Sequence, residues 1–537
     1  MTSQPTVWDV TYDLLRELGL TTVFGNPGST EQTFLKNFPG DFSYILGLQE
    51  ASVLAMADGF AQSTGKPALV NLHTAAGTGN AMGSLIAAYK SNTPLIVTAG
   101  QQTREMVLCE PYLTNTNEAL LPLPWAKWVY QPARAEDVPA AFMRAYTIAT
   151  QPPAGPVYLS IPLDDWEKPA LGPAVVRTAS QRFAPDAERL AEFAERINRA
   201  QRPALVFGPE VDRAGGWDAA VELAEKVHAP VYSGPLPDRL SFPEDHPLYQ
   251  GLLPMTIAEV TETLRGHDLV VVIGAQVFRY YPYVPGEYLP EDTELLQITC
   301  DPFLAGAAQV GDSLLSDTLL ALRQLTPLIE AKAGRPTPKP LDRTPGRVES
   351  AHAPLAPVQV YSALNVLKPA NAALVNESTS TMAEQERWLP TVHPVSFFAT
   401  GSGGIGWGVP GAVGVALGDR AVGRKRVVIA TIGDGSFQYS IQAIWTAAQH
   451  KLPIVFVVMR NGEYSVLKSF ALLEKTPNVP GLNLPGLDIE SLAVGFGCHA
   501  VTVDGTEQLA KEFNAALGAD GPTVIVVPTK PQVAHLG

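Results

Sequence analysis

The chain has 537 residues, 46% of them hydrophobic and 17% charged, a composition that can bury large cores and excludes an intrinsically disordered chain. Its formal net charge of -15 disfavours binding to the phosphate backbone of nucleic acids. The N-terminus lacks the basic start and apolar block of a secretory signal, and no apolar run reaches the length of a membrane helix. We therefore expect a cytoplasmic protein that binds neither membranes nor nucleic acid.

The first third of the chain alternates short strand-like runs with helical patterns. PALVNLHT at 67–74 and TPLIVTAG at 93–100 are rich in apolar and β-branched residues, and the helical AMGSLIAAYK lies between them. A further strand-like run, AGPVYLSIP at 154–162, closes this part. This order of strands and helices is typical of βαβ units around a parallel sheet.

The middle third has strand-like runs of its own at 203–211, 268–275 and 295–302, separated by helical stretches such as WDAAVELAEKV. These runs predict another open α/β sheet. The G-x-G-x-x-G loop of a dinucleotide site is missing from this part, so we expect no cofactor in it.

The last third repeats the order of the first. ATIGDGSFQYS precedes a helix expected to carry Ile441 and Trp445, KLPIVFVVM follows, and DGPTVIVVP at 520–528 closes the region. Pro94 and Pro453 mark corresponding strand starts in the two parts. We infer that the first and third parts are related by duplication.

The predicted fold class is therefore α/β, with three open parallel-sheet domains. Two Pro-rich stretches, 168–188 and 330–358, interrupt the pattern and are typical of linkers. The predicted boundaries are a first domain at 1–180, a central domain at 181–335, a linker at 336–357 and a third domain at 358–537.

The most informative local motif is Gly433-Asp434-Gly435-Ser436, which lies between an apolar strand and a helix. Glycines let the backbone approach an anion, and the N-terminus of the following helix offers free N–H groups. Asp434 would repel a phosphate unless a cation lies between them. Mg²⁺ prefers oxygen ligands and often retains substrate phosphates, and Asn461 supplies a second oxygen after the next strand.

Further motifs occur in the first third and at the start of the last: GNPGS at 25–29, LQEA at 48–51, NLHT at 71–74, GTGN at 77–80 and NESTST at 376–381. Together with the GDGS motif and the spacing to Asn461, they make the chain resemble the thiamine diphosphate-dependent 2-oxo acid decarboxylases, above all the benzoylformate decarboxylases. The resemblance covers essentially the whole chain except the linkers. It implies a pyrimidine-binding, a central and a diphosphate-binding domain.

The resemblance implies thiamine diphosphate and Mg²⁺, with Ca²⁺ as an alternative ion, as cofactors. Glu50 would stabilise the reactive tautomer of the aminopyrimidine, Ile405 would support the bent cofactor, and the Gly403 carbonyl would accept from the pyrimidine amine. Asp434, Asn461 and the Glu463 carbonyl would bind the metal. The remaining implied cofactor contacts are Asn26, Pro27, Gly28, Thr379, Ser380, Gly433, Gly435, Ser436, Tyr464 and Ser465.

The resemblance also assigns the substrate side. Ser29 would bind the carboxylate of a small-molecule 2-oxo acid and His73 would transfer a proton, so that an aromatic or bulky acid loses CO₂ and yields an aldehyde. The implied pocket residues are Tyr112, Leu113, Ala399, Val466, Leu467 and Phe470.

Several positions depart from the family pattern. The middle-domain segment that carries a second catalytic histidine in benzoylformate decarboxylases ends here in Tyr281, and a phenol is a poorer proton shuttle at neutral pH than an imidazole. Ala399 replaces a phenylalanine, and Tyr112 replaces a leucine, so we expect a pocket of altered shape. Arg460 and Ser465 replace an asparagine and a glycine near the diphosphate.

Other functions stay open at this point. A carboligase or lyase of 2-hydroxy ketones, as in benzaldehyde lyase, or a flavin-containing acetohydroxyacid synthase would use the same scaffold. A dehydrogenase loop at Gly77-Thr78-Gly79 lacks the expected third-glycine spacing. A sensor that binds the cofactor without turnover is a further alternative.

The resemblance bears on assembly as well. In this family the pyrimidine domain of one subunit faces the diphosphate domain of another, which implies homodimer pairs, commonly paired into a homotetramer. The sequence itself does not distinguish this from pairing within one chain.

Overall fold

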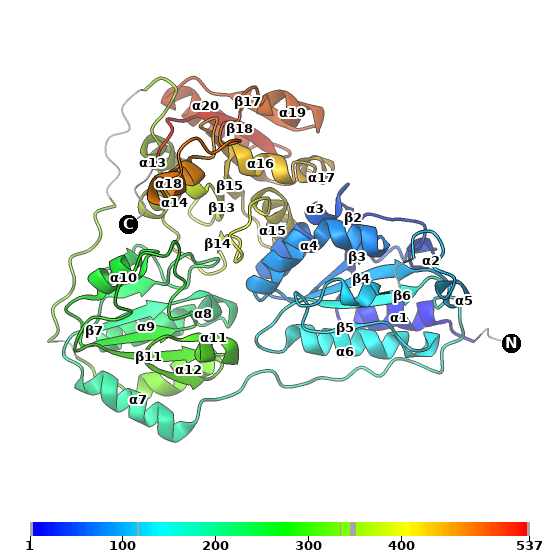
Figure 1. The fold of residues 1–537 in the computed structure, drawn as a ribbon, viewed down its shortest axis with the longest axis horizontal. Helices are drawn as coiled ribbons and strands as arrows, with labels where there is room; N and C mark the ends of the chain where they lie inside the picture. Colours follow the sequence, from blue (N-terminus) through cyan, green and yellow to red (C-terminus); the bar gives the residue numbers. More distant parts are fainter. Residues whose placement is uncertain (1–3, 115–116, 333, 344–350, 534–537) are drawn as a thin grey trace.

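The computed structural model describes residues 4–114, 117–332, 334–343 and 351–533. In this part of the chain three parallel six-stranded sheets form three lobes, which follow one another along the sequence from blue to red in Figure 1. The inner strands are buried along their whole length, except for the last residue of β16, as expected for parallel sheets covered by helices. The predicted fold class is confirmed, whereas the domain boundaries stay predictions.

The N-terminal domain has the strand order β2-β1-β3-β4-β6-β5. Its strands are β1 (Thr22–Gly25), β2 (Ser43–Leu46), β3 (Ala68–Leu72), β4 (Leu95–Gln101), β5 (Val129–Tyr130) and β6 (Val157–Pro162). Its helices are α1 (Val7–Glu17), α2 (Gln32–Leu35), α3 (Glu50–Thr64), α4 (Thr74–Lys90), α5 (Arg104–Val107) and α6 (Val138–Thr150).

The C-terminal domain has the order β14-β13-β15-β16-β18-β17, which repeats the N-terminal order strand for strand and supports the inferred duplication. Its strands are β13 (Ala373–Glu377), β14 (Phe397–Phe398), β15 (Val428–Gly433), β16 (Ile454–Arg460), β17 (His499–Thr502) and β18 (Thr523–Pro528). Its helices are α13 (Pro357–Leu367), α14 (Met382–Trp388), α15 (Gly408–Ala421), α16 (Asp434–Tyr439), α17 (Ala443–Gln449), α18 (Ser465–Leu473), α19 (Ile489–Gly495) and α20 (Thr506–Leu517).

One expected helix of this domain is divided. The helix predicted to carry both Ile441 and Trp445 is two short helices, α16 and α17, and Ile441 lies between them. Ser440 breaks the helical path because its backbone has ψ of 40°.

The middle domain has the order β12-β11-β10-β7-β8-β9, the doubly wound arrangement in which the chain switches direction between its first and fourth strands. Its strands are β7 (Pro203–Phe207), β8 (Val231–Ser233), β9 (Tyr249–Leu252), β10 (Leu269–Ile273), β11 (Glu294–Thr299) and β12 (Asp312–Leu315). Its helices are α7 (Ala187–Arg199), α8 (Pro209–Arg213), α9 (Trp217–Val227), α10 (Ile257–Leu264), α11 (Pro302–Ala307) and α12 (Thr318–Leu325). The strand predicted at 203–211 is shorter than expected because Pro209 begins α8.

Helices α3 and α15 join the two related domains (Figure 1). Met56 and Phe60 of α3 and Val413 and Leu417 of α15 belong to one hydrophobic core. At the far end the Ser63 hydroxyl donates to Asp419, with an oxygen–oxygen distance of 2.7 Å. The N- and C-terminal domains of one chain are therefore packed as a single body.

No helix in the described residues is long and apolar enough to cross a membrane.

A buried acid in the N-terminal domain generates a prediction about pH. Burial raises the pKa of Glu118 from 4.5 to about 8, although hydroxyls of Tyr158 and Ser160 donate to its carboxylate. Over that range the folded protein holds a proton that the unfolded chain releases, so this group makes the free energy of unfolding fall as pH rises.

Replacing Glu118 by glutamine removes the titrating group. We expect urea unfolding of wild type to lose more stability than E118Q between about pH 5 and pH 8. Parallel stability curves for the two proteins would contradict this expectation.

Candidate active site

Glu50 is the first residue of α3 and lies in a polar cluster of the N-terminal domain. Its Oε1 accepts from Asn26 Nδ2 at 2.9 Å, and its Oε2 accepts from Asn80 Nδ2 at 3.0 Å. Burial opposes the charged form, but these two amides outweigh it and lower the pKa of Glu50. The side chain is therefore a charged carboxylate in an almost buried site, 7% exposed.

His73 lies at the carboxyl end of β3 and immediately precedes α4. Its Nδ1 lies 2.8 Å from Oε2 of Glu31, whose side chain is fully buried. A carboxylate can only accept a hydrogen bond, so in this pair Nδ1 carries the proton and Nε2 is left for other partners. The imidazole is 22% exposed, so a small molecule can reach it.

Glu31 also holds the loop that follows β1. Its Oε2 accepts from the Gly28 amide at 3.0 Å, and its Oε1 accepts from the Gly100 amide at 2.9 Å and from the Thr30 hydroxyl. Residue 28 must be glycine because a Cβ there would lie 1.9 Å from Nδ1 of His73. The predicted loop of Asn26, Pro27, Gly28 and Ser29 is thereby fixed against His73, with Ser29 exposed beside it.

Asp434 begins α16 directly after β15 in the C-terminal domain. Its Oδ1 accepts from the Gly435 amide at 2.9 Å and its Oδ2 from the Gly462 amide at 2.7 Å. Burial raises the pKa of its carboxyl, while these amides oppose the shift. Asn461, after β16, is linked to the same turn because its Oδ1 accepts from the Glu463 amide at 3.0 Å.

The donors around this turn fit a hard divalent cation. Asp434 and Asn461 both present side-chain oxygens, the type of ligand that Mg²⁺ and Ca²⁺ prefer. The Glu463 carboxylate is engaged elsewhere, by the Ser465 hydroxyl at 2.7 Å and by Lys468, which leaves its backbone carbonyl as the candidate donor. The Tyr464 ring lies against Gly435. A Cβ at residue 435 would lie 2.4 Å from Cε1 of Tyr464, so the turn leaves room only for glycine there.

The other predicted cofactor contacts border this turn or the adjacent loops. Ser436 is buried in α16, Ser465 begins α18, and Thr379 and Ser380 follow β13 in a short 3₁₀ helix. Gly403 is exposed and Ile405 is half-buried in the loop before α15.

The residues predicted to line the substrate pocket come from all three domains. Tyr281 of the middle domain packs against Phe470 of α18, with ring centroids 5.0 Å apart. Ala399 lines a small cavity whose other lining residues belong to the middle and C-terminal domains. Tyr112 is 90% exposed, however, and contributes a backbone oxygen to Gln102 rather than a wall to a pocket.

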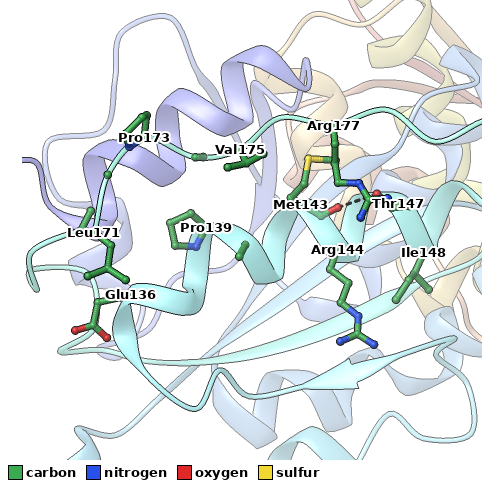
Figure 2. Close-up of a pocket in the computed structure, with 14 residues that line it drawn as sticks. Glu136, Pro139, Met143, Arg144, Thr147, Ile148, Leu171, Pro173, Val175 and Arg177 are labelled. Carbon is green, nitrogen blue, oxygen red and sulfur yellow. Dashed lines mark hydrogen bonds between the residues drawn. The ribbon is translucent and has the colours of Figure 1, made fainter.

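Within one chain these groups form two separate sets. The hydrogen bonds of Glu50 lie inside the N-terminal domain and those of Asp434 inside the C-terminal domain. Leu113, half-buried beside Tyr112, belongs to the first set, and Val466 and Leu467 of α18 belong to the second. A cavity of about 550 Å³ lies between α6 and residues 170–177, and no predicted site residue lines it (Figure 2).

The switch point of the middle sheet is occupied by a side chain. Glu210 of α8 accepts from the Thr299 hydroxyl at 2.7 Å and from the Cys300 amide at 2.9 Å, at the carboxyl ends of β7 and β11. The carboxylate thus takes the place at which doubly wound sheets bind ligands.

Sequence reasoning assigned no role to Glu31 or Glu377. Glu31 lies two residues after Ser29, but its partners His73 and Gly100 are remote in the sequence. Glu377 lies inside the NESTST segment and is 3% exposed. For Glu377 the available signal was an acidic residue at the end of the apolar run ALVNE, whereas Glu31 has no comparable local signal.

The chain matches three models of thiamine pyrophosphate enzymes in order. The N-terminal TPP binding domain covers residues 5–119, the central domain 190–325 and the C-terminal TPP binding domain 378–527. The protein therefore belongs to the thiamine diphosphate enzymes.

Within them it belongs with the benzoylformate decarboxylases. It is 46% identical to benzoylformate decarboxylase of Pseudomonas aeruginosa over 98% of this chain and 99% of that protein. The crystal structure of benzoylformate decarboxylase from Polynucleobacter necessarius matches with a TM-score of 0.96 and 49% identity, covering 98% of this chain and 99% of the other. The 4-hydroxybenzoylformate decarboxylase of Rhodococcus jostii RHA1 matches with a TM-score of 0.95 and 41% identity, covering 99% and 100%.

The Glu31 site yields a stability prediction. Each carboxylate oxygen accepts from one backbone amide, so a glutamine at this position must point its NH₂ group at an amide N–H in either orientation. We expect E31Q to lower the free energy of unfolding by about 1–3 kcal/mol in urea at pH 7.

The matched control is Glu167→Gln, which removes an exposed ion pair with Lys36 in the same domain and should cost less than about 1 kcal/mol. Equal stability of E31Q and E167Q would show that the buried network is not needed.

Proposed function

We propose that the protein is a cytoplasmic enzyme that decarboxylates an aromatic or bulky 2-oxo acid, similar to benzoylformate, to an aldehyde and CO₂ without oxidation. The observation that carries the proposal is Glu50, an almost buried carboxylate kept charged by Asn26 and Asn80 in a chain whose relatives include benzoylformate decarboxylases. The acidic composition supports small-molecule chemistry rather than nucleic-acid binding.

Residues of the C-terminal domain would hold the cofactor's diphosphate. The Asp434 carboxylate, the Asn461 amide oxygen and the Glu463 carbonyl would bind Mg²⁺, or Ca²⁺ in its place. The contacts proposed for the diphosphate are Thr379, Ser380, Gly433, Gly435, Ser436, Tyr464 and Ser465. When bound, thiamine diphosphate supplies the electron sink that makes loss of CO₂ possible.

Three residues would bind or support the aminopyrimidine ring of the cofactor. The charged Glu50 would accept a hydrogen bond from the ring nitrogen and favour the reactive tautomer. Ile405, half-buried in its loop, would support the bent shape, and the carbonyl of Gly403 would accept from the amine. The loop of Asn26, Pro27 and Gly28 would pack beside the ring.

Ser29 and His73 would handle the substrate. The exposed Ser29 hydroxyl is suited to donate to the substrate carboxylate, and His73 Nε2 is suited to move a proton because Glu31 holds Nδ1. Both lie on the loops that Glu31 ties together, so they would act at a fixed separation.

The side chains of Tyr281, Phe470, Val466, Leu467 and Ala399 would form an apolar pocket. Tyr281 packs on Phe470 and would offer a phenol hydroxyl where the family has an imidazole. Tyr112 and Leu113 would complete the pocket from the N-terminal domain of a second subunit.

We also propose that the working unit is a homodimer or a pair of homodimers. Exposed apolar side chains gather at both half-sites, with Leu108 92% and Tyr112 90% exposed near one and Leu472 56% exposed near the other. Monomers rarely leave such surfaces open to water. The two sets of site residues within one chain have separate contacts, which supports completion by a second copy.

The proposed reaction is tested with purified protein, thiamine diphosphate and Mg²⁺ on a panel of aromatic and branched 2-oxo acids. We expect CO₂ and the matching aldehyde from at least one aromatic acid. Faster formation or cleavage of 2-hydroxy ketones would favour a carboligase, and flavin absorbance in the purified protein would favour an acetohydroxyacid synthase.

Glu50→Gln tests the assigned carboxylate. It should lower kcat by about 100-fold or more, because it loses the charge that favours the reactive tautomer, and still bind the cofactor. Glu17→Gln, an exposed change at the end of α1, is the control and should keep full activity. Full activity of E50Q would refute the role given to Glu50.

Assembly is tested by light scattering at the concentrations used for activity. We expect a mass of at least twice the chain mass of 57.4 kDa. Leu108→Glu should shift the protein toward monomers with loss of activity, whereas Leu171→Glu, 79% exposed beside the cavity of Figure 2, should not. A fully active particle with the mass of one chain would contradict the proposal.

A further inference from the structure

Glu377 is a buried carboxylate that the proposed reaction does not use. It ends β13, is 3% exposed, and its Oε1 accepts from the amides of Gly406 at 3.0 Å and Trp407 at 2.9 Å. These are the two residues that follow Ile405 in the chain. Oε2 has no hydrogen-bond partner among the described residues.

Trp407 forms a second anchor for the same backbone. Its side chain is 2% exposed, and its indole Nε1 donates to Oδ2 of Asp58 on α3 at 2.8 Å. The chain just after Ile405 is therefore held by one carboxylate through its backbone and by another through a side chain. Asp58 belongs to the N-terminal domain, so the second anchor also crosses between domains.

The segment before these anchors has much less support. Gly403 and Gly404 are exposed and Ile405 is half-buried. The Gly401 amide donates to the Ser91 hydroxyl at 3.0 Å, which fixes the far end of the segment. The residues between these two fixed points are the ones expected to touch the cofactor.

We infer that Glu377 is a positioning residue for the cofactor, which acts by fixing the backbone that carries Ile405 and Gly403. The inference rests on the proposed function, because it gives these two residues their place under the pyrimidine. A charged acceptor binds an N–H about twice as strongly as a neutral one, so the carboxylate restrains the loop more firmly than an amide would. Burial raises the pKa of Glu377 to about 7, while the neighbouring backbone amides oppose the shift, so the comparison with glutamine is made at about pH 8, where the side chain is charged.

A purely structural role has to be separated from this one. Glu377 also stabilises the start of α15, and a carboxylate that did only this would change global stability without changing the loop or the cofactor. The useful readouts are therefore local amide exchange in the protein without cofactor and the dissociation constant of the cofactor.

The experiment compares full-length wild type, Glu377→Gln and Glu210→Gln. Glu210 is the matched control because it is also a buried acid that accepts from a backbone amide, in the middle domain. In protein without cofactor, we expect hydrogen exchange of the peptide covering 401–408 to be about tenfold faster in E377Q. The same variant should raise the Kd of thiamine diphosphate with Mg²⁺ about tenfold, which corresponds to about 1.4 kcal/mol.

E210Q should leave the hydrogen exchange of this peptide and the Kd of thiamine diphosphate unchanged. If E377Q changes neither, or if E210Q changes both equally, the inference is wrong. If E377Q does not fold, Glu377→Asp replaces it, since the side chain that is shorter by one methylene withdraws the carboxylate from the Gly406 and Trp407 amides and should speed exchange of the same peptide. Unchanged exchange in E377D would then overturn the inference.

The outcome is independent of the proposed reaction. Failure of wild type to bind thiamine diphosphate would refute the proposed function, and the exchange comparison would still show whether Glu377 restrains the loop.

Discussion

Buried carboxylates hold several loops of this site in place through backbone amides. A carboxylate removed from water must recover its hydrogen bonds from the protein. Glu31 recovers them from the loop after β1 and from the end of β4, Asp434 from its own turn and the turn after β16, and Glu377 from the loop before α15. Each acid therefore ties together segments that are distant in the sequence. The chain has 53 acidic residues, and these three join distant segments through hydrogen bonds inside the protein.

The repeated strand order explains how one architecture serves two purposes. The loops after β3 and β15 occupy equivalent places in their sheets, yet one carries His73 and the other Asp434. The matching order supports an origin by duplication, and the two equivalent edges carry different candidate groups, His73 proposed for proton transfer and Asp434 proposed for metal binding. The middle sheet differs from the other two, because the Glu210 side chain fills its switch point.

Local patterns predicted most of the fold. The strand ends at Pro162 and Pro528, the paired strand starts after Pro94 and Pro453, and the turn at Asp434 are visible in short stretches of sequence. Glu31 was not predictable in this way because its role depends on Gly100 and His73, which only the folded sheet brings to it. The same holds for contacts between domains.

Contacts between domains depend on how the folded domains are placed as well as on residue type. The link between Trp407 and Asp58 requires α3 and α15 to lie side by side, and the packing of Tyr281 on Phe470 requires the middle domain to reach α18. Neither pair leaves a periodic signal in the sequence. Motif spacing therefore predicts the chemistry of the site, but not the contacts between domains that hold its parts.

Helices α3 and α15 have a consequence beyond stability. Glu50 begins α3, the loop with Ile405 leads into α15, and the two helices share one core. The pair therefore fixes the distance between Glu50 and the loop that carries Ile405 within one chain. The connecting segments around the middle domain do not set this distance. They are accordingly the places where insertions and changes of length can accumulate without altering the geometry of the cofactor site.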